Sequence, residues 1–551
     1  MNGIDVLRDP LLNQGTGFSK EQREQLGLVG LLPPRVQTLE EQERQIYAQY
    51  QGKGSNLEKR QLLIDVYETN RTLFYAVVID HVAELMPIIY APVVAEAVKQ
   101  YDQLFLAPHD EVFLSIDEPD NNPAAIERSL CAGAQDRDIR LIVVTDSEGI
   151  LGIGDWGVNG AELVLGKSMV YTAAAGVNPS SILPIVLDVG TDNEQLLADP
   201  GYLGNRHPRV RGERYDRFID DFVQAVRTVF PSALLHWEDF GRDNAQALLD
   251  RYHDVLPTFN DDVQGTGAVA LAGILGALRQ SGQRFEDQRF MVYGAGTAGV
   301  GIARQLYREL LRDGLSPDEA RSRFYLLDRQ GLLFADTPDM TDGQREFARP
   351  AAERPAGRSA RDIVSLREAV TLAHPGVLIG TSTQPGAFDR DVVEAMAKFT
   401  PRPIILPISN PTELAEATAK HLVVWSNGQA LVGTGAPSLD AHYDGVDYRF
   451  GQMNNALVYP ALGFGAVAVG ARAINDTMIS VAAHALGDLA SNGARGSAIL
   501  PPMSQIRDFS LLVAEAVAQS AIDQGLASHP VDDVHALMLQ QRWTPQYPQS
   551  C

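Results

Sequence analysis

Two pairs of carboxylates lie close together in the chain, each at the end of an apolar segment. Glu238 and Asp239 belong to LHWEDF (residues 235–240), and Asp261 and Asp262 belong to FNDDVQGT (259–266). Like charges at the ends of buried segments repel one another and lose hydration, so they persist where a cation lies between them. Oxygen donors with no cysteine nearby favour Mg²⁺ or Mn²⁺ over zinc. We predict a divalent-metal site here. Helix capping or pairing with arginines is the alternative.

A glycine-rich turn, GAGTAG (294–299), follows the second pair. It comes after a predicted strand over 289–293 and opens a predicted helix that ends before Gly314. In such a turn the glycines allow a tight bend and a close approach to a pyrophosphate, which lies at the helix N-terminus. A purely structural turn is the alternative. The residues predicted to bind the dinucleotide are Gly294, Gly296, Thr297, Ala298 and Gly299.

Asp328 ends the next predicted strand, 324–327, where an acid accepts hydrogen bonds from the adenosine ribose and favours NAD. It comes 29 residues after Gly299 instead of about 20, and a short helical turn near Ser316 accounts for the excess. Arg329 lies beside Asp328 and could bind a 2′-phosphate, so NADP stays an alternative to NAD.

Four other side chains are candidates for chemistry or for substrate binding. Lys167 begins a predicted helix over 167–175, where a helix N-terminus and a bound cation would lower its pKa from about 10.4 towards the 7–8 useful for a base. A solvated lysine is the alternative. Tyr90 is by default a buried tyrosine. Asn410 follows a predicted strand over 403–406, and Asn455 precedes an apolar helix; both could be turn or cap residues instead.

The elements around these residues predict an α/β fold class. Helical periodicity over 38–51 and 57–69 indicates a helical N-terminal region, assigned to residues 1–130. Buried strands predicted over 141–146, 182–188 and 233–237 indicate an α/β substrate and metal region over 131–265. Alternating strands and helices then predict a doubly wound, Rossmann-like NAD-binding domain over 266–525. Residues 526–551 are a tail or docking arm, and 336–361 an exposed connection.

Composition excludes several classes of partner. The formal net charge of −24 opposes nucleic acid or an anionic membrane surface. Two uncharged runs, 168–187 and 450–471, are broken by polar residues and proline, so we expect no membrane segment. No export signal is evident at the start. The two cysteines, Cys131 and Cys551, cannot form a disulfide framework, and a reducing cytoplasm fits.

The motifs taken together resemble the malic enzyme family, in one order from about residue 11 to 547. The motifs that carry the resemblance are MPIIYAP, VVTDSEGILGIGDWG, GK, WEDF, FNDDVQGT, GAGTAG, SNPT and QMNNA. The resemblance implies a metal- and NAD(P)-dependent decarboxylase of L-malate that forms a homodimer or homotetramer. It implies these roles: Glu238, Asp239 and Asp262 as metal ligands, Lys167 as base with support from Asp261, Tyr90 as acid, and Asn410 and Asn455 near the substrate.

One departure separates the family's two branches. Oxidative malic enzymes usually carry an arginine before ILG, where this chain has Gly149. GDWGVNG, LGNRH, HWEDFGR and GTSTQPGAF look like malolactic enzymes, which convert L-malate to L-lactate and CO₂ without net NADH release. We favour that branch, with oxidative NAD-malic enzyme as the alternative. Arg242 or Arg71 could replace the missing arginine.

Two further alternatives come from other functional classes. A non-catalytic NAD-binding protein would keep the glycine turn but have no use for four carboxylates and Lys167. A metal-free hydroxyacid dehydrogenase would stay fully active in excess chelator.

Overall fold

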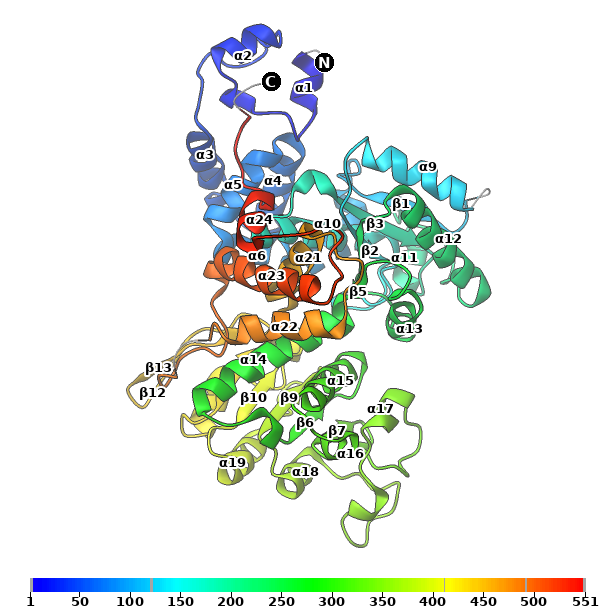
Figure 1. Ribbon diagram of the computed structural model, residues 1–551, viewed down its shortest axis with the longest axis vertical. Helices are drawn as coiled ribbons and strands as arrows, with labels where there is room; N and C mark the ends of the chain where they lie inside the picture. Colours follow the sequence, from blue (N-terminus) through cyan, green and yellow to red (C-terminus); the bar gives the residue numbers. More distant parts are fainter. Residues whose placement is uncertain (1–2, 119–121, 411, 491–492, 549–551) are drawn as a thin grey trace.

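The N-terminal region is helical, as predicted. The computed structural model describes residues 3–118, 122–410, 412–490 and 493–548 (Figure 1). The helices of this region are α1 (Gly3–Arg8), α2 (Lys20–Gln25), α3 (Leu39–Gln51), α4 (Asn56–Thr69), α5 (Arg71–Asp80), α6 (Val82–Ile89), α7 (Val93–Lys99) and α8 (Tyr101–Leu104). Thr38 and Ser55 begin α3 and α4 with reciprocal capping boxes, so the sequence predicted both helices to within one residue.

A five-stranded parallel sheet follows, with the order β1-β3-β2-β4-β5. Its strands are β1 (Val112–Ser115), β2 (Leu141–Thr145), β3 (Ile182–Asp188), β4 (Leu234–Trp237) and β5 (Thr258–Asn260), and its helices are α9 (Pro123–Ala134), α10 (Ala161–Val170), α11 (Glu194–Ala198), α12 (Glu213–Val229) and α13 (Arg242–Tyr252). Every residue of β2 and β3 is buried, as expected for a parallel sheet covered on both faces. Because β1 pairs with β3, this sheet begins before the predicted boundary at residue 130.

The second sheet is doubly wound and has seven strands in the order β14-β11-β10-β9-β6-β7-β8. Its strands are β6 (Phe290–Tyr293), β7 (Phe324–Asp328), β8 (Gly331–Leu332), β9 (Val377–Gly380), β10 (Ile404–Pro407), β11 (Leu431–Thr434) and β14 (Gly451–Gln452). The pairs are parallel except β7 with β8. The helices here are α14 (Thr266–Ser281), α15 (Thr297–Arg312), α16 (Pro317–Arg321), α17 (Asp342–Glu346), α18 (Leu366–Ala373), α19 (Arg390–Phe399) and α20 (Ala419–Trp425). A short antiparallel hairpin, β12 (Ala441–Tyr443) and β13 (Val446–Tyr448), projects from the molecule (Figure 1).

The last helices return to the first half of the chain (Figure 1). They are α21 (Tyr459–Ala468), α22 (Asp476–Gly487), α23 (Ile506–Asp523) and α24 (Val534–Gln541). Helix α22 packs on α14, whereas α21 and α23 pack on the turn 171–175. The tail then docks, because the Trp543 amide donates to Gly176 O and Asn70 donates to the Tyr547 hydroxyl. The predicted unit 266–525 therefore shares its last helices with the first half, since their apolar faces are buried there.

Among the described residues, no helix is long and apolar enough to cross a bilayer. The two uncharged runs instead supply buried segments of the core, around α10 and β3 and in α21.

Candidate active site

Three of the predicted carboxylates converge where the first sheet ends. Glu238 and Asp239 follow β4, and Asp262 lies in the turn after the adjacent strand β5. Parallel strands place their carboxyl ends at one edge, so residues 23 apart in sequence meet: the Asp239 amide donates to Asp262 Oδ2 at 2.7 Å. Oxygen atoms of all three carboxylates lie within 4.8 Å of one another. We call this set the carboxylate trio.

The electrostatics of the trio fit a divalent cation. Burial raises the pKa of Asp239 well above its usual range, and the charges of Asp262 and Glu238 raise it further. Burial and Glu238 likewise raise the pKa of Asp262 to about 7. A doubly charged ion among these oxygens would remove both penalties, and hard oxygen donors suit Mg²⁺ or Mn²⁺. The residues present therefore match the predicted metal, whose binding stays a prediction.

Lys167 lies beside the trio, fully buried. Its Nζ is 2.9 Å from Glu238 Oε1 and also contacts Asp261 Oδ2. The Asn455 amide donates to that same Asp261 oxygen. Lys167 and Asn455, which are far apart in the sequence, thus both contact the carboxylate of Asp261. The other oxygen, Asp261 Oδ1, is buried without a hydrogen-bond partner among the described residues.

One expectation for Lys167, its place at the start of a helix, is wrong. It lies in the last turn of α10, which begins at Ala161, and the chain continues through a π-helical turn over 171–175. A helix N-terminus therefore does not act on the ammonium. Burial disfavours the charged form, but Asp261 and Glu238 outweigh it and raise the pKa of Lys167 well above its usual value. The lowered pKa was predicted for a lysine beside a bound cation and stays a prediction for the metal-bound chain. The sequence does not show which carboxylates the fold brings close to Lys167 Nζ.

His236 supports the site and is not a fourth free ligand. Burial lowers its pKa to about 3, so the ring is neutral. Its Nδ1 lies 2.7 Å from the Tyr171 hydroxyl and its Nε2 lies 3.0 Å from Glu238 Oε2. We assign the Nε2–H tautomer, which donates to Glu238 and accepts from Tyr171. The sequence gave no sign of Tyr171, which comes from a different element.

Tyr90 is also close to Lys167. Its ring centroid is 5.5 Å from Lys167 Nζ. Burial raises the pKa of Tyr90 well above its usual range despite Lys167, so the hydroxyl is protonated at neutral pH. Gly166 permits this approach, because a Cβ there would lie 2.9 Å from Ile89 O and 3.6 Å from the Tyr90 ring.

The predicted dinucleotide turn has the required geometry. Gly296 caps α15, whose first residues are Thr297, Ala298 and Gly299. Gly294 has φ +103°, and a Cβ on it would lie 2.6 Å from the Ser382 amide nitrogen. Above Gly296 there is open space within 4 Å, which leaves room for a pyrophosphate at the N-terminus of α15.

Asp328 ends β7 beside this turn. One of its oxygens accepts from Gln344 Nε2 at 2.6 Å, and the same Nε2 donates to Ala295 O. Gln344 therefore joins the acid predicted at the ribose to the glycine turn. Gln344 was not predicted, because 336–361 looks like an exposed connection, whereas it contains the short helix α17 (Asp342–Glu346), in which Gln344 is buried. A capping box from Thr341 to Gln344 was the available signal.

Asn410 lies beyond β10 and next to the glycine-rich loop of the first half. A Cβ on Gly152 would lie 3.9 Å from Asn410 O. That loop contacts the trio, because the Leu151 amide donates to Asp239 Oδ2 at 2.8 Å. Pro411, in the same SNPT motif, lies outside the described residues.

Glu416 is a second residue that the sequence analysis missed. It is fully buried, and its Oε1 accepts from the hydroxyls of Ser382, at 2.8 Å, and Ser409, at 2.6 Å. It therefore ties the end of β9 to the end of β10, next to Asn410.

The two halves of the site are in direct contact. Helix α15 packs on the turn that carries Asp261 and Asp262. Gly301 makes this possible, since a Cβ there would lie 3.1 Å from Val263 O. A dinucleotide at the start of α15 and a substrate at the trio would therefore lie close to each other.

The structure separates the two arginines considered for the substrate. Arg71 stacks on Tyr67, 3.4 Å from the ring centroid, and pairs with Asp110 at 2.6 Å. Arg71 is thus held within the helical region. Arg242 is exposed at the start of α13, three residues after Asp239, and remains a candidate.

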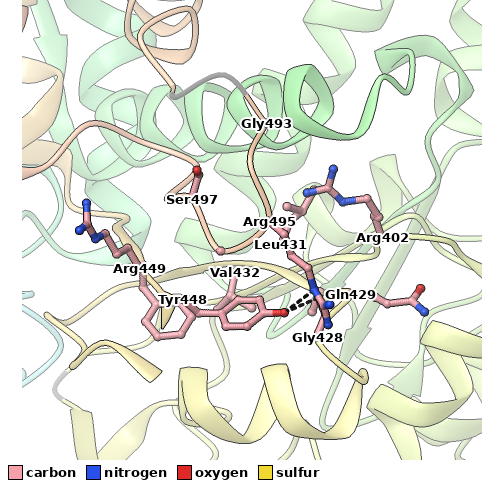
Figure 2. Close-up of a pocket in the computed structure, with 13 residues that line it drawn as sticks. Arg402, Gly428, Gln429, Leu431, Val432, Tyr448, Arg449, Gly493, Arg495 and Ser497 are labelled. Carbon is pink, nitrogen blue, oxygen red and sulfur yellow. Dashed lines mark hydrogen bonds between the residues drawn. The ribbon is translucent and has the colours of Figure 1, made fainter. Parts of the chain in front are cut away.

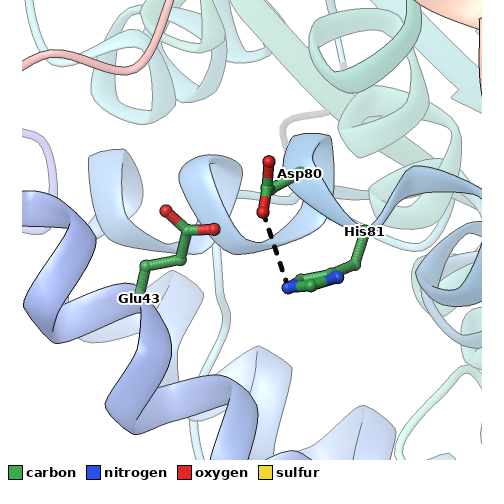
Figure 3. Close-up of side chains that lie close together, drawn as sticks. All are labelled: Glu43, Asp80 and His81. Carbon is green, nitrogen blue, oxygen red and sulfur yellow. Dashed lines mark ion pairs between the residues drawn. The ribbon is translucent and has the colours of Figure 1, made fainter.

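A second group of possible ligands lies in the helical region. Glu43 on α3, Asp80 at the end of α5 and His81 also bring ligand atoms within 4.8 Å of one another (Figure 3). His81 Nε2 is 3.7 Å from Asp80 Oδ2, and the Asp80 side chain is 71% exposed. Among the residues that the structure describes, neither strand ends nor a buried cation accompany this group, so we do not assign a site to it.

Fold and site together define a class of protein: a two-sheet α/β protein in which a doubly wound dinucleotide fold faces a buried acidic centre. Family models identify the particular family. The malic enzyme N-terminal domain matches residues 67–253, and the malic enzyme NAD-binding domain matches residues 263–522. The chain belongs to the malic enzyme family, as predicted.

Individual proteins extend this result over the full length. The chain is 51% identical to the malolactic enzyme of Leuconostoc mesenteroides over 99% of both chains. It is 45% identical to NAD-dependent malic enzyme 3 of Bacillus subtilis over 99% of this chain and 96% of that one. The solved malic enzyme structure from Entamoeba histolytica shares the fold, with a TM-score of 0.56 and 21% identity over 94% of this chain and 91% of that one.

Proposed function

We propose that this chain decarboxylates L-malate to L-lactate and CO₂ with NAD and Mn²⁺ or Mg²⁺ bound. The observation that carries malate chemistry is Lys167 Nζ held between Asp261 and Glu238, beside the carboxylate trio. Relatives described as malolactic enzymes, at 47–51% identity, support the malolactic outcome.

Glu238, Asp239 and Asp262 would hold the metal, which would polarise the substrate oxygens, and bound NAD would accept and return a hydride. The chain's own part begins at Lys167. With Glu238 engaged as a ligand, Asp261 is the carboxylate left to stabilise the ammonium, which brings Lys167 closer to the neutral amine that can take the C2 hydroxyl proton. Asn455 keeps Asp261 in place by donating to it.

Tyr90 is suited to the opposite role. Because burial keeps its hydroxyl protonated, it can donate a proton to the carbon that loses CO₂. The dry surroundings of Lys167 and Tyr90 also protect the intermediate from water. Asn410, next to the Gly152 loop, lies where the nicotinamide or the substrate carboxylate would be bound.

The malolactic outcome requires pyruvate and NADH to stay together until hydride returns. Gly149 supports this branch: its amide donates to Asp239 O at 3.0 Å, and a Cβ there would lie 3.1 Å from Phe240 O. The position that carries an arginine in oxidative relatives is thus in contact with the trio. Oxidative NAD-malic enzyme remains the second candidate, favoured by the 45% identity to the Bacillus subtilis protein.

The test incubates the purified protein with L-malate, Mn²⁺ and NAD⁺ and follows lactate, pyruvate and NADH absorbance together. Lactate without a rise in NADH supports the proposal. Stoichiometric NADH and pyruvate would establish the oxidative reaction instead. Full activity in excess chelator would favour a metal-free dehydrogenase. Binding of NAD without any turnover of malate would favour a non-catalytic protein.

A pair of variants tests the role of Gly149. We expect Gly149→Arg to release a larger share of product as pyruvate and NADH, whereas Gly149→Ala tests the steric cost of a Cβ alone. The same product ratio in Gly149→Arg and the unsubstituted chain would show that this position does not set the outcome. The predicted homodimer or homotetramer stays a prediction, which light scattering of the purified protein would test. The predicted cytoplasmic location also stays a prediction.

A further inference from the structure

A cavity of about 290 Å³ lies at the end of the second sheet opposite to the glycine turn (Figure 2). Arg402 precedes β10, and Gly428 lies in the turn before β11. Arg495 and Tyr448 come from the loop after α22 and from β13. Dinucleotides bind beyond the carboxyl ends of parallel strands, and this cavity is at the amino ends of β10 and β11, so it is separate from the cofactor site. We call it the arginine pocket.

Positive charge gathers at this cavity in a chain that carries 70 acidic and 46 basic residues. Arg402, Arg449 and Arg495 all line it. Among the described residues, Arg402 and Arg449 pair with no carboxylate, and Arg495 has one at 3.4 Å, Asp444. Figure 2 shows Arg402 and Arg495 on the same side of Tyr448, with Arg449 extending away from them.

The two arginines on that side are held in place. Arg402 has φ +52°, a left-handed conformation that costs a non-glycine residue free energy and often marks a functional position. Its Nη1 donates to Gln280 O at 2.5 Å. Arg495 Nε donates to the Tyr448 hydroxyl at 2.8 Å, and that hydroxyl donates to Gly428 O. Both guanidinium groups keep further N–H donors for a ligand.

Arg402 also lacks compensation for its partial burial. Desolvation lowers the pKa of Arg402 from its ordinary value, and no carboxylate offsets the loss. An anion in the pocket would supply the missing charge. A carboxylate is satisfied by one planar fork, whereas a tetrahedral dianion accepts hydrogen bonds from several directions, as two arginines from different loops offer. Leu431, Val432 and Phe450 line the remaining wall and leave room for a small carbon body.

We propose that the arginine pocket binds a small metabolite through its phosphate group, held by Arg402 and Arg495. This site is independent of malate turnover, so its test needs no activity.

The experiment is calorimetric titration of the full chain with phenyl phosphate at constant ionic strength. Mg²⁺ and saturating NAD⁺ are present, so that the glycine turn is filled. We expect one site per chain and an affinity at least about tenfold weaker in Arg495→Gln and in Arg402→Gly. Arg402→Gly removes the guanidinium and relieves the left-handed backbone, so it is expected to fold at least as well. Arg217→Gln, which removes an exposed arginine on α12, is the matched charge control and should bind like the unsubstituted chain.

Three results would overturn the proposal. They are the absence of saturable binding to the unsubstituted chain, equal affinities in the pocket variants and in Arg217→Gln, and equal affinity for benzoate and phenyl phosphate. The last would show that a carboxylate serves as well as a phosphate.

Discussion

The carboxylate trio and the Glu43–Asp80–His81 group satisfy the same proximity criterion in different surroundings. In both, three ligand atoms lie within 4.8 Å of one another. The trio lies at the ends of two parallel strands, next to a fully buried lysine, whereas the second group lies between helices with Asp80 71% exposed. Water reaches the exposed Asp80 of the second group, whereas burial and mutual repulsion disfavour the charged forms of both Asp239 and Asp262 in the trio. Proximity alone therefore does not define a metal site. Burial of carboxylates whose negative charges lack a compensating cation is the better criterion.

The largest expected effect comes from removing the buried cation. Lys167→Met should lower kcat by about 10²–10⁴, because the proposed base is lost. In the metal-free protein it should also cost about 3–5 kcal/mol of unfolding free energy, because Asp261 and Glu238 are left buried without their partner. Steady-state lactate formation and urea unfolding measure the two effects. Lys59→Met, which removes a lysine 4.8 Å from the Tyr50 ring in the helical region, is the control. Equal activity in both variants would contradict the role of Lys167.

Loss of a trio carboxylate should come next. Asp262→Asn keeps the side-chain shape and should lower kcat/KM by more than about 10², since outer-shell partners of metal ligands alone cost 10–100-fold. Without metal the same variant should be more stable than the unsubstituted chain, because one repelling buried charge is gone. Mn²⁺ titration and thermal unfolding with and without Mn²⁺ measure this. Asp80→Asn should leave Mn²⁺ binding and kcat/KM unchanged. If it weakens Mn²⁺ binding as much as Asp262→Asn, the comparison between the two groups fails.

A half-buried carboxylate should give an intermediate effect. Asp328→Asn removes the charged acceptor at the predicted ribose position and should raise the KM for NAD⁺ about tenfold with little change in kcat. Gln344→Ala, which releases Asp328 from the glycine turn, should shift the KM in the same direction by less. An unchanged KM in Asp328→Asn would place the ribose elsewhere.

The smallest effect belongs to the exposed group and depends on pH. Burial and the Asp80 charge raise the pKa of Glu43 from 4.5 to about 7. Between those values the folded chain holds a proton that the unfolded chain has released, so this contribution to stability is present below pH 4.5 and is lost as the pH rises towards 7. Asp80→Asn should flatten that slope in urea unfolding at pH 5, 6 and 7.5, by less than about 1 kcal/mol given solvent screening. Parallel profiles would show that Asp80 does not act on Glu43.

The elements and the glycine turn could be predicted from the sequence because their signals are local. Ile182–Asp188 was predicted with its observed bounds, and the short helix before β7 that explains the late position of Asp328 was expected. The errors arose where a residue's role depends on distant partners. Gln344 lies in a stretch whose composition looks exposed, and Glu416 lies in a polar stretch, so neither sequence pattern indicates a buried role. Lys167 was placed at the wrong end of its helix, because the small apolar residues before it carry no clear start signal.

The amino-acid sequence by itself determined the two α/β layers, the dinucleotide turn and the pairs of acids at the ends of strands, because periodicity and turn chemistry act over a few residues. Only the tertiary structure decided that Lys167, Asp261 and Asn455 meet, that Asp261 and Glu238 both act on the pKa of Lys167, and that two arginines border one cavity at the far end of the sheet. Charge and burial are set by side chains hundreds of residues apart, and their balance exists only once the chain has packed.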